Sequence, residues 1–275
     1  MEQQPIQNTS YSHAAYSANA GFVPLLTSRI TALLAPTPAD RILDIGAGDL
    51  ILTAKIAAHA HSVLAIDAST ELISAGRALF PESEHANLST RVVDCRYLSA
   101  QTDIVDGSWD KVFSNAALHW ILRDEGTRGE VVRAVHGCLR SGGRFVAEMG
   151  GFGNIGEVHA AMTAALVIHG VAVEEVRRAN PWWFPSEAGM RGLLEEAGFE
   201  VEMMEVEWRP TELDGERGVV GWMEMFGQRF LELVEEGKRA EVSRTAEGLL
   251  QAAARREDGK WVLGYVRLRW VAVKK

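Results

Sequence analysis

The sequence predicts an α/β protein built on a doubly wound, mostly parallel sheet with helical insertions. Three observations support this fold class. Short apolar strands alternate with helices from residue 41 to about residue 150. The first of these strands runs into a glycine turn and then a helix, as in nucleotide-binding sheets. Finally, an acidic residue ends each of the first three strands, at the edge where such sheets bind their ligands.

The first strand and the turn after it are the most informative segment. Apolar residues from Arg41 lead to the acid Asp44, Gly46 and Gly48 follow, and an apolar helix is expected from Ile51 to about Ala60. Glycines let backbone N–H groups approach a ligand where a Cβ atom would collide. The start of the helix adds further unpaired N–H donors. The segment therefore predicts a site for a nucleotide-like ligand.

Two phosphate-binding motifs do not fit this turn. A dinucleotide fingerprint has a third glycine at the position that Ile51 occupies here. A P-loop closes on Gly-Lys-Ser or Gly-Lys-Thr, whereas Lys55 lies inside the expected helix with no Ser or Thr after it. Asp44 stands directly before the glycines, where its charge repels phosphate and attracts a cation. We therefore expect a nucleotide-like ligand that carries positive charge.

The next two strands also end in aspartates. The strand 62–66 leads to Asp67, which follows Gly46 by 21 residues, close to the roughly 20-residue spacing of a ribose-hydroxyl acceptor. Its carboxylate can accept hydrogen bonds from both ribose hydroxyls. The strand 88–93 leads to Asp94. One such aspartate is weak evidence because aspartate is common at helix caps, but three in register with the glycine turn favour one ligand site.

The remaining elements are expected on either side of this core. A polar arm and a helix at about 23–34 come first, and the fifth strand covers 143–149. After it the alternation lengthens, which predicts one domain with insertions. Gly198 is expected to cap the helix before it, and Asp258-Gly259 to form a turn. The later elements predicted are the helices 155–176, 186–197 and 214–257 and the strands 199–208 and 261–273.

The amino-acid composition limits which binding partners and which cellular location are expected. The chain has 275 residues, 47% of them hydrophobic, and a net charge of −9, which predicts a soluble globular protein. Without a basic stripe, neither nucleic acid nor an anionic membrane is expected as a partner. Cys95 and Cys138 lack metal-ligand spacing, so no metal is expected. A polar start and the lack of a long apolar run predict a cytoplasmic location.

Five segments resemble those of class I S-adenosylmethionine-dependent methyltransferases. The resemblance covers nearly the whole chain and is closest to small-molecule enzymes similar to trans-aconitate methyltransferase. It implies a Rossmann-like sheet of seven strands with an antiparallel last strand at its edge. It also implies S-adenosyl-L-methionine as cofactor and S-adenosyl-L-homocysteine as product. The segments are Leu43–Gly48, Ala65–Ser69, Val92–Cys95, Trp109–Trp120 and Leu139–Val146.

The resemblance also implies roles for individual residues. Asp44 would contact the methionine end of the cofactor, Asp67 the ribose and Asp94 the adenine amino group. Residues 1–38 would form an arm and helix that close over the cofactor. Residues 39–275 would form the methyltransferase domain, with helical cap insertions at about 152–198 and 211–257. The predicted cofactor-binding residues are Tyr16, Asp44, Gly46, Ala47, Gly48, Asp67, Ala68, Asp94, Cys95, Asn115 and Ala116.

Two positions in this site allow two interpretations each. The family usually has a third glycine where this chain has Leu50. Leu50 either starts the helix and packs on the sheet, or reshapes and weakens the methionine pocket. Cys95 either lines the adenine site or is a small buried hydrophobic residue.

The acceptor is expected beside the end of the fourth strand, near Ser114 to Trp120. Methyl transfer is an in-line displacement for which the protein supplies orientation and excludes water. His119 is the candidate catalytic residue, because histidine titrates near neutral pH. It acts as a general base, as a hydrogen-bonding or shaping residue of the substrate site, or only as a structural residue. A carboxylate acceptor would need no base.

Aromatic residues in the insertions are candidates for substrate contact. A stripe from Trp222 to Phe230 has helical spacing and is more often core than pocket, although it would also suit a cap over an apolar substrate. Trp182 and Trp183 lie between two prolines, which favours a pocket. In the related enzymes an N-terminal aromatic arm closes over the cofactor, and Tyr16 and Tyr11 match its positions. The predicted substrate-binding residues are Tyr11, His119, Trp120, Trp182, Trp183 and Trp222.

Three functions compete at this point. The first is methylation of a small molecule, primarily O-methylation of a carboxylate or a hydroxyl. The second is a non-methylating step on the same cofactor scaffold, such as a cyclisation or an elimination; Leu50 and the lack of a convincing base motivate it. The third is a nicotinamide-dependent oxidoreductase, against which Ile51 and the expected antiparallel last strand count.

Overall fold

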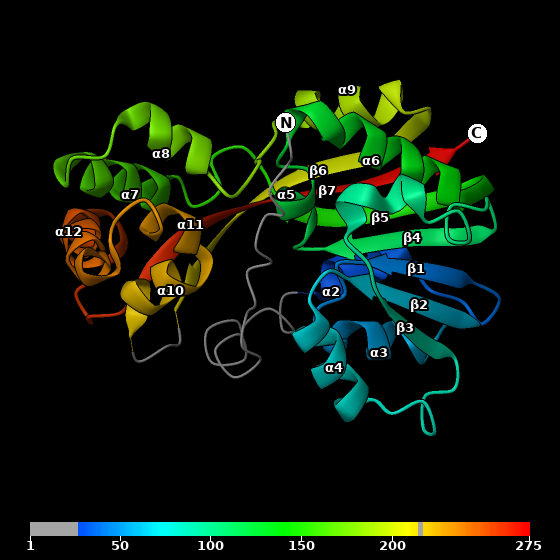
Figure 1. Ribbon diagram of the computed structural model, residues 1–275. Helices are drawn as coiled ribbons and strands as arrows, with labels where there is room; N and C mark the ends of the chain where they lie inside the picture. The colour runs from blue at the N-terminus through cyan, green and yellow to red at the C-terminus, as the bar shows by residue number, and fades with distance from the viewer. Residues whose placement is uncertain (1–26, 214–216) are drawn as a thin grey trace.

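The computed structural model of the chain describes residues 27–213 and 217–275. Its centre is a seven-stranded sheet in the order β3-β2-β1-β4-β5-β7-β6 (Figure 1). The first five strands are parallel, and β7 runs antiparallel to both of its neighbours. The predicted doubly wound, mostly parallel sheet is therefore confirmed. The strands are β1 Arg41–Ile45, β2 Ser62–Asp67, β3 Leu88–Val92, β4 Trp109–Asn115, β5 Leu139–Gly150, β6 Phe199–Glu212 and β7 Val262–Lys274.

The last strand corrects one expectation. We expected an antiparallel strand at the edge, but β7 lies between β5 and β6, with Arg267 opposite Gly150 on one side and Glu207 on the other. The edge strand is β6. It continues beyond the predicted 199–208 because the first half of β7 pairs with it as far as Glu212. The middle of β7 is therefore flanked by a hydrogen-bonded strand on each edge.

The helices confirm most predicted segments but break two of them. The segment expected as one helix at 155–176 is two, because Gly170 adopts a φ of +90° that ends the first. The segment expected at 214–257 forms three helices in its described part, 217–257. The helices are α2 Ser28–Leu34, α3 Ile51–Ala57, α4 Thr70–Leu79, α5 Leu118–Ile121, α6 Glu125–Cys138, α7 Gly156–Ile168, α8 Val173–Ala179, α9 Glu187–Glu196, α10 Gly218–Phe226, α11 Gln228–Leu231 and α12 Glu236–Ala254, with the 3-10 helix η2 at Cys95–Ala100.

Helices cover both faces of the sheet. On one face α2, α3 and α4 bury apolar side chains against β1, β2 and β4. On the other face α6, α9 and η2 pack against β4, β5 and β7. Gly198, with a φ of +99°, ends the α9 segment as predicted. The start predicted for α2, near residue 23, lies outside the described residues, and its described part begins at Ser28.

A second apolar cluster lies beyond the carboxyl ends of the parallel strands. There α7, α8, α10, α11 and α12 gather around the first half of β7, at the left of Figure 1. These helices come from the two predicted insertions, whereas α9, from the first insertion, packs on the sheet beside β6 and α6. Within the described ranges, no helix is both long and apolar enough to cross a membrane.

Candidate active site

The glycine turn after β1 has the close backbone packing that the sequence predicts. Gly46 has a φ of +73°, and a Cβ atom there would stand 2.2 Å from Ala117 Cβ, so only glycine fits. Gly46 and Ala47 donate their N–H groups to Ile66 O at 2.8 and 3.1 Å. Gly48, with a φ of +60°, would have no described atom within 4 Å of a Cβ. The turn is thus locked to β2 and faces open space at Gly48.

Leu50 occupies the position of the missing third glycine. It keeps a left-handed φ of +65°, a conformation that leucine rarely adopts. Its side chain is fully buried and lies against Gly76 of α4, where a Cβ atom would stand 2.5 Å from Leu50 Cγ. The packing interpretation of Leu50 is therefore favoured over a reshaped methionine pocket.

Beside this turn lie two carboxyl groups, that of Asp44, which is buried, and that of Asp67, which is half-buried. Thr53 Oγ1 donates to Asp44 Oδ2 at 2.7 Å. Burial raises the pKa of Asp44 to about 7, although the Thr53 hydrogen bond lowers it, and the charge of Asp67 raises it further. Asp67 accepts N–H groups from Gly48 at 3.0 Å and Ser69 at 2.8 Å. Burial also raises the pKa of Asp67, and these backbone donors oppose that rise.

Asp94 is the N-cap residue of η2. Its carboxylate accepts the backbone N–H of Arg96 at 3.1 Å and pairs with the guanidinium of the same residue. Burial raises the pKa of Asp94, but the Arg96 hydrogen bonds outweigh it and leave the pKa lowered. The buried Cys95 has a strongly raised thiol pKa, caused by burial and by the charges of Asp67, Asp94 and Asp44. The charges of all three predicted cofactor carboxylates therefore act on one thiol.

The turn after β4 completes this edge. Ser114 Oγ donates to Ile45 O at 2.8 Å and joins β4 to β1. Asn115 Oδ1 is buried and has no hydrogen-bond partner among the described residues. Ala116 holds a φ of +55° and donates its N–H to Glu148 O at 2.8 Å. Backbone strain at a non-glycine residue concentrates at functional sites, so this turn is a candidate ligand contact.

His119 lies on α5, directly after this turn. Its ring is buried, its centroid is 5.5 Å from that of Trp120 and 5.6 Å from that of Phe184, and its Nδ1 has no hydrogen-bond partner within the described part of the chain. Burial, with a smaller effect from the Arg267 charge, lowers the His119 pKa to about 3. The imidazole is therefore neutral at ordinary pH and is a weak base.

The predicted aromatic residues divide into two groups. The rings of Trp120 and Trp182 have centroids 5.5 Å apart, and those of Trp182 and Trp222 lie 6.0 Å apart. Trp222 Nε1 donates to Tyr265 Oη at 2.7 Å. These rings form one cluster at the His119 end of the sheet. Trp183 instead packs with the sheet-side core, its ring 4.0 Å below a guanidinium of α6. Tyr11 and Tyr16 lie outside the described residues.

Sequence reasoning missed the charged residues Glu148, Arg267 and Arg269. All three are buried on β5 and β7, close to the Ala116 turn. A signal was available, because these charged residues interrupt two largely apolar segments that were predicted as strands. In the ranges 27–213 and 217–275, no group of three or more His, Cys, Asp or Glu side chains is placed to hold a metal ion.

The chain resembles known proteins in sequence and in fold. Residues 43–147 match the model of a methyltransferase domain family. The chain is 40% identical over 265 residues to the uncharacterized methyltransferase C70.08c of Schizosaccharomyces pombe, which covers 96% of this chain and 98% of that protein. Two solved structures share the fold. The candidate methyltransferase BH2331 of Bacillus halodurans has a TM-score of 0.61 at 14% identity, over 91% of this chain and 99% of that chain.

The second structure is geranyl diphosphate C-methyltransferase of Streptomyces coelicolor, solved with Mg²⁺, geranyl diphosphate and S-adenosyl-L-homocysteine. Its TM-score is 0.53 at 14% identity, over 98% of this chain and 86% of that chain. The relative of 40% identity along nearly the whole length decides the family, and the cofactor of that family is S-adenosyl-L-methionine. This chain belongs to the class I S-adenosylmethionine-dependent methyltransferases.

Proposed function

We propose that this methyltransferase methylates an oxygen of a small molecule, and that the acceptor oxygen belongs to a carboxylate rather than a hydroxyl. The observation that carries this proposal is the neutral, buried His119 with a pKa of about 3. A hydroxyl acceptor needs a base of suitable pKa to take its proton. A carboxylate is already ionised at neutral pH and needs none. His119 then serves as a hydrogen-bonding residue through its unpartnered Nδ1.

The cofactor assignments rest on the chemistry of the donor set. Asp44 would hold the positively charged methionine end, because a cation beside a buried carboxyl group offsets its desolvation. The Asp67 carboxylate accepts backbone N–H groups of Gly48, Ala68 and Ser69, and its remaining lone pairs would accept the ribose hydroxyls. Asp94 would accept from the adenine amino group beside Cys95. Gly46, Ala47, Gly48, Ala68, Asn115 and Ala116 would line the backbone side of the same ligand.

The chain's own residues position the acceptor and exclude water. S-adenosyl-L-methionine, when bound, supplies a methyl group activated by the sulfonium. His119 and the rings of Trp120 and Trp182 would form an apolar wall with one polar atom at the end of β4. We propose that the helices around Trp222 form the cap of this site. The arm at 1–38, with Tyr11 and Tyr16, would close it.

We also infer the class of partner from the net charge and the cellular location from the two cysteines. The net charge of −9 opposes binding to nucleic acid or to anionic membranes, which favours a small-molecule partner. Cys95 and Cys138 are both free and buried, which is compatible with a reducing cytoplasm.

The test is a mass-spectrometric scan with S-adenosyl-L-methionine that carries a deuterated methyl group. Purified protein is incubated with a metabolite extract supplemented with tricarboxylic acids. A protein-dependent ester that carries the label supports O-methylation of a carboxylate. A labelled ether, amine or thioether contradicts the proposed acceptor. If the cofactor binds and no label transfers to any acceptor, the result contradicts methylation and favours a non-methylating step such as a cyclisation or an elimination.

A further inference from the structure

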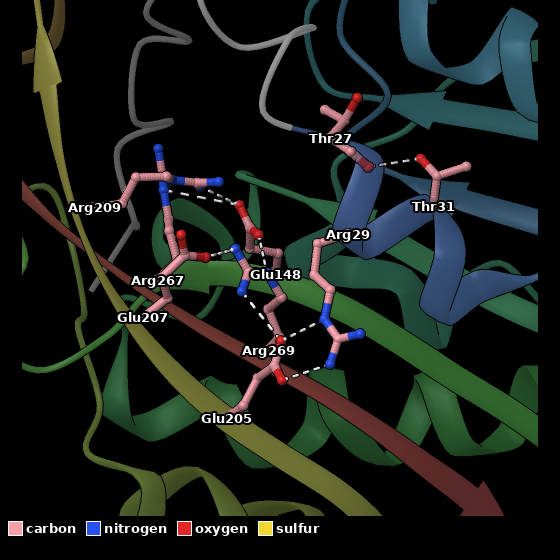
Figure 2. Close-up of polar contacts among 9 residues, drawn as sticks. All are labelled: Thr27, Arg29, Thr31, Glu148, Glu205, Glu207, Arg209, Arg267 and Arg269. Carbon is pink, nitrogen blue, oxygen red and sulfur yellow. Dashed lines mark hydrogen bonds and ion pairs between the residues drawn. The ribbon is translucent and has the colours of Figure 1, made fainter.

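A network of charged side chains crosses β5, β7 and β6, as Figure 2 shows. Its outer end is on α2, where Arg29 donates to both carboxylate oxygens of Glu205 at 3.0 and 2.8 Å. Arg269 continues inward from Glu205 to Glu148. Glu148 is 3% exposed and Arg269 is 2% exposed, so the inner end is sealed from water. The network consists of Arg29, Glu148, Glu205, Glu207, Arg209, Arg267 and Arg269.

Glu148, at the centre, is bound by two arginines and leaves a third poorly paired. Arg269 Nε donates to Glu148 Oε2, and Arg209 Nη2 donates to Oε1 at 3.0 Å. Arg267 Nε is 3.8 Å from the same Oε1, which is too far for a hydrogen bond. Arg267 Nε has no other hydrogen-bond partner in the described part of the chain. Arg29, Arg209 and Arg269 each donate a hydrogen bond to a glutamate of this network, whereas Arg267 makes only the longer contact to Glu148.

The buried environment of Arg267 makes its poor pairing with Glu148 costly. The residue is 6% exposed, and its guanidinium lies 4.7 Å from the centroid of the Tyr265 ring. Burial lowers the Arg267 pKa, although the Glu148 charge opposes that effect. A buried cation whose carboxylate partner lies beyond hydrogen-bond distance is poorly compensated for its loss of hydration, and such perturbed charges cluster at functional sites.

Arg267 also lies where the acceptor is expected. It pairs across the sheet with Gly150, at the carboxyl end of β5. Glu148 O accepts the N–H of Ala116, which ties the network to the turn after β4. The Arg267 charge acts on His119, whose Nδ1 is also unpartnered among the described residues. A guanidinium and a neutral imidazole, each with a nitrogen that has no hydrogen-bond partner among the described residues, therefore lie near enough to interact electrostatically.

We propose that Arg267 binds an oxyanion of the methyl acceptor, a carboxylate or a phosphate, and thereby selects anionic acceptors. A guanidinium offers two parallel N–H groups that match such an anion, and binding would give Arg267 the close anionic partner that Glu148 does not supply. The bound oxyanion is separate from the oxygen that is methylated, because a guanidinium on the attacking oxygen would reduce its nucleophilicity. Glu148 and Arg269 are positioning residues that hold Arg267 in place. This inference rests on the proposed small-molecule function.

The test measures anion binding without turnover. The full chain, saturated with S-adenosyl-L-homocysteine, is labelled with ¹⁵N-histidine, and the His119 ring signal is assigned by comparison with His119→Gln. Citrate and inorganic phosphate are titrated separately at constant ionic strength, with trimethyl citrate as the uncharged counterpart of citrate. Arg267→Gln removes the proposed donor. Arg29→Gln is the matched control, because it removes the same charge from the exposed end of the same network.

We expect citrate or phosphate, but not trimethyl citrate, to shift the His119 signal to saturation. Tighter binding of citrate identifies a carboxylate, and tighter binding of phosphate identifies a phosphate. Arg267→Gln should weaken binding by about tenfold or more, the loss of a paired charge-assisted contact, whereas Arg29→Gln should stay within about twofold. The proposal is overturned if neither anion gives a saturable shift, or if Arg267→Gln binds as the unmodified protein does.

A second variant covers the case in which Arg267→Gln does not fold, as judged by its near-ultraviolet circular dichroism. Arg267→Lys keeps the charge but cannot form the paired N–H contact, so we expect anion binding about three- to tenfold weaker. Equal affinity in this variant would contradict a guanidinium contact. Because the titration needs no methyl transfer, its failure leaves the proposed function standing. Failure of the labelled-methyl scan likewise leaves the anion titration intact.

Discussion

Leu50 of the glycine turn and Gly76 of α4 form a matched pair. The leucine side chain occupies the space of a Cβ atom at Gly76, which would stand 2.5 Å from Leu50 Cγ. The departure from the family's third glycine is therefore balanced by a glycine on the facing helix. The left-handed backbone of the turn is kept, and the added side chain goes into the core rather than toward Gly48.

We predict that Gly76→Ala destabilises the protein. In an open helix position this change would stabilise by about 0.5–1 kcal/mol, because glycine costs conformational entropy. Here the added methyl group collides with Leu50, and overpacking costs about 1–3 kcal/mol. Urea unfolding measures the change in the free energy of unfolding.

Two further variants isolate the collision. Gly192 of α9 has no described atom within 4 Å of a Cβ position, so Gly192→Ala should be neutral or stabilising. In a Leu50→Ala background, Gly76→Ala should cost less than in the unmodified protein, because the two changes are coupled. Strictly additive effects would refute the contact.

The turn and the three aspartates could be predicted from sequence because local signals specify them. Glycines at Gly46 and Gly48 and acids at three strand ends have fixed spacings, and the strands that carry them pair with near neighbours. The position of β7 could not be predicted in this way. The insertion of β7 between β5 and β6 depends on pairing with segments that are distant in the sequence. The pattern of apolar and polar residues within β7 does not indicate which strands it will pair with.

The proximity of the charged residues of the site could not be predicted from the sequence for the same reason. Glu148 and Arg267 are 119 positions apart, and only the β5–β7 pairing brings them together. The sequence also could not separate Trp182 from its neighbour Trp183, whose side chains enter different clusters. The break at Gly170 was missed because a glycine inside a helical pattern is compatible with both a kink and a continuous helix.

The buried side chains of His119 and Asp44 should change the stability of the protein with pH in opposite directions. The folded His119 pKa of about 3 is below its ordinary 6.5. Its contribution is therefore complete above pH 6.5 and is lost as the pH falls toward 3, by at most about 1.4 kcal/mol per pH unit. The folded Asp44 pKa of about 7 is above its ordinary 3.8, so its contribution is lost as the pH rises from 3.8 to 7.

Urea unfolding between pH 4 and pH 7 separates these contributions. His119→Gln should remove a positive slope of stability against pH, and Asp44→Asn should remove a negative one. If both variants keep the slope of the unmodified protein, the two groups are not perturbed as the structure indicates.

Cofactor binding should release a proton from Asp44. The methionine end of the cofactor carries positive charge and favours the ionised carboxylate, which forms only in part below pH 7 in the free protein. Affinity should then fall as the pH drops below 7, by up to about tenfold per unit. Isothermal titration in buffers of different ionisation enthalpy measures the released protons. Asp44→Asn is the control, since the ligand's own titration is common to both proteins, and equal release from both would refute the assignment.

The measurement closest to the central claim is the affinity of Asp67→Ala for S-adenosyl-L-methionine, by isothermal titration at pH 7.5. Asp67 is held by Gly48 and Ser69 at the centre of the proposed cofactor site. Loss of its hydrogen bonds to the ribose should cost about 1.5–3 kcal/mol, which weakens binding by about ten- to 150-fold. Asp103→Ala, which changes an exposed aspartate paired with Arg91, should bind normally. An Asp67→Ala protein that is folded and binds the cofactor with unchanged affinity would contradict the account.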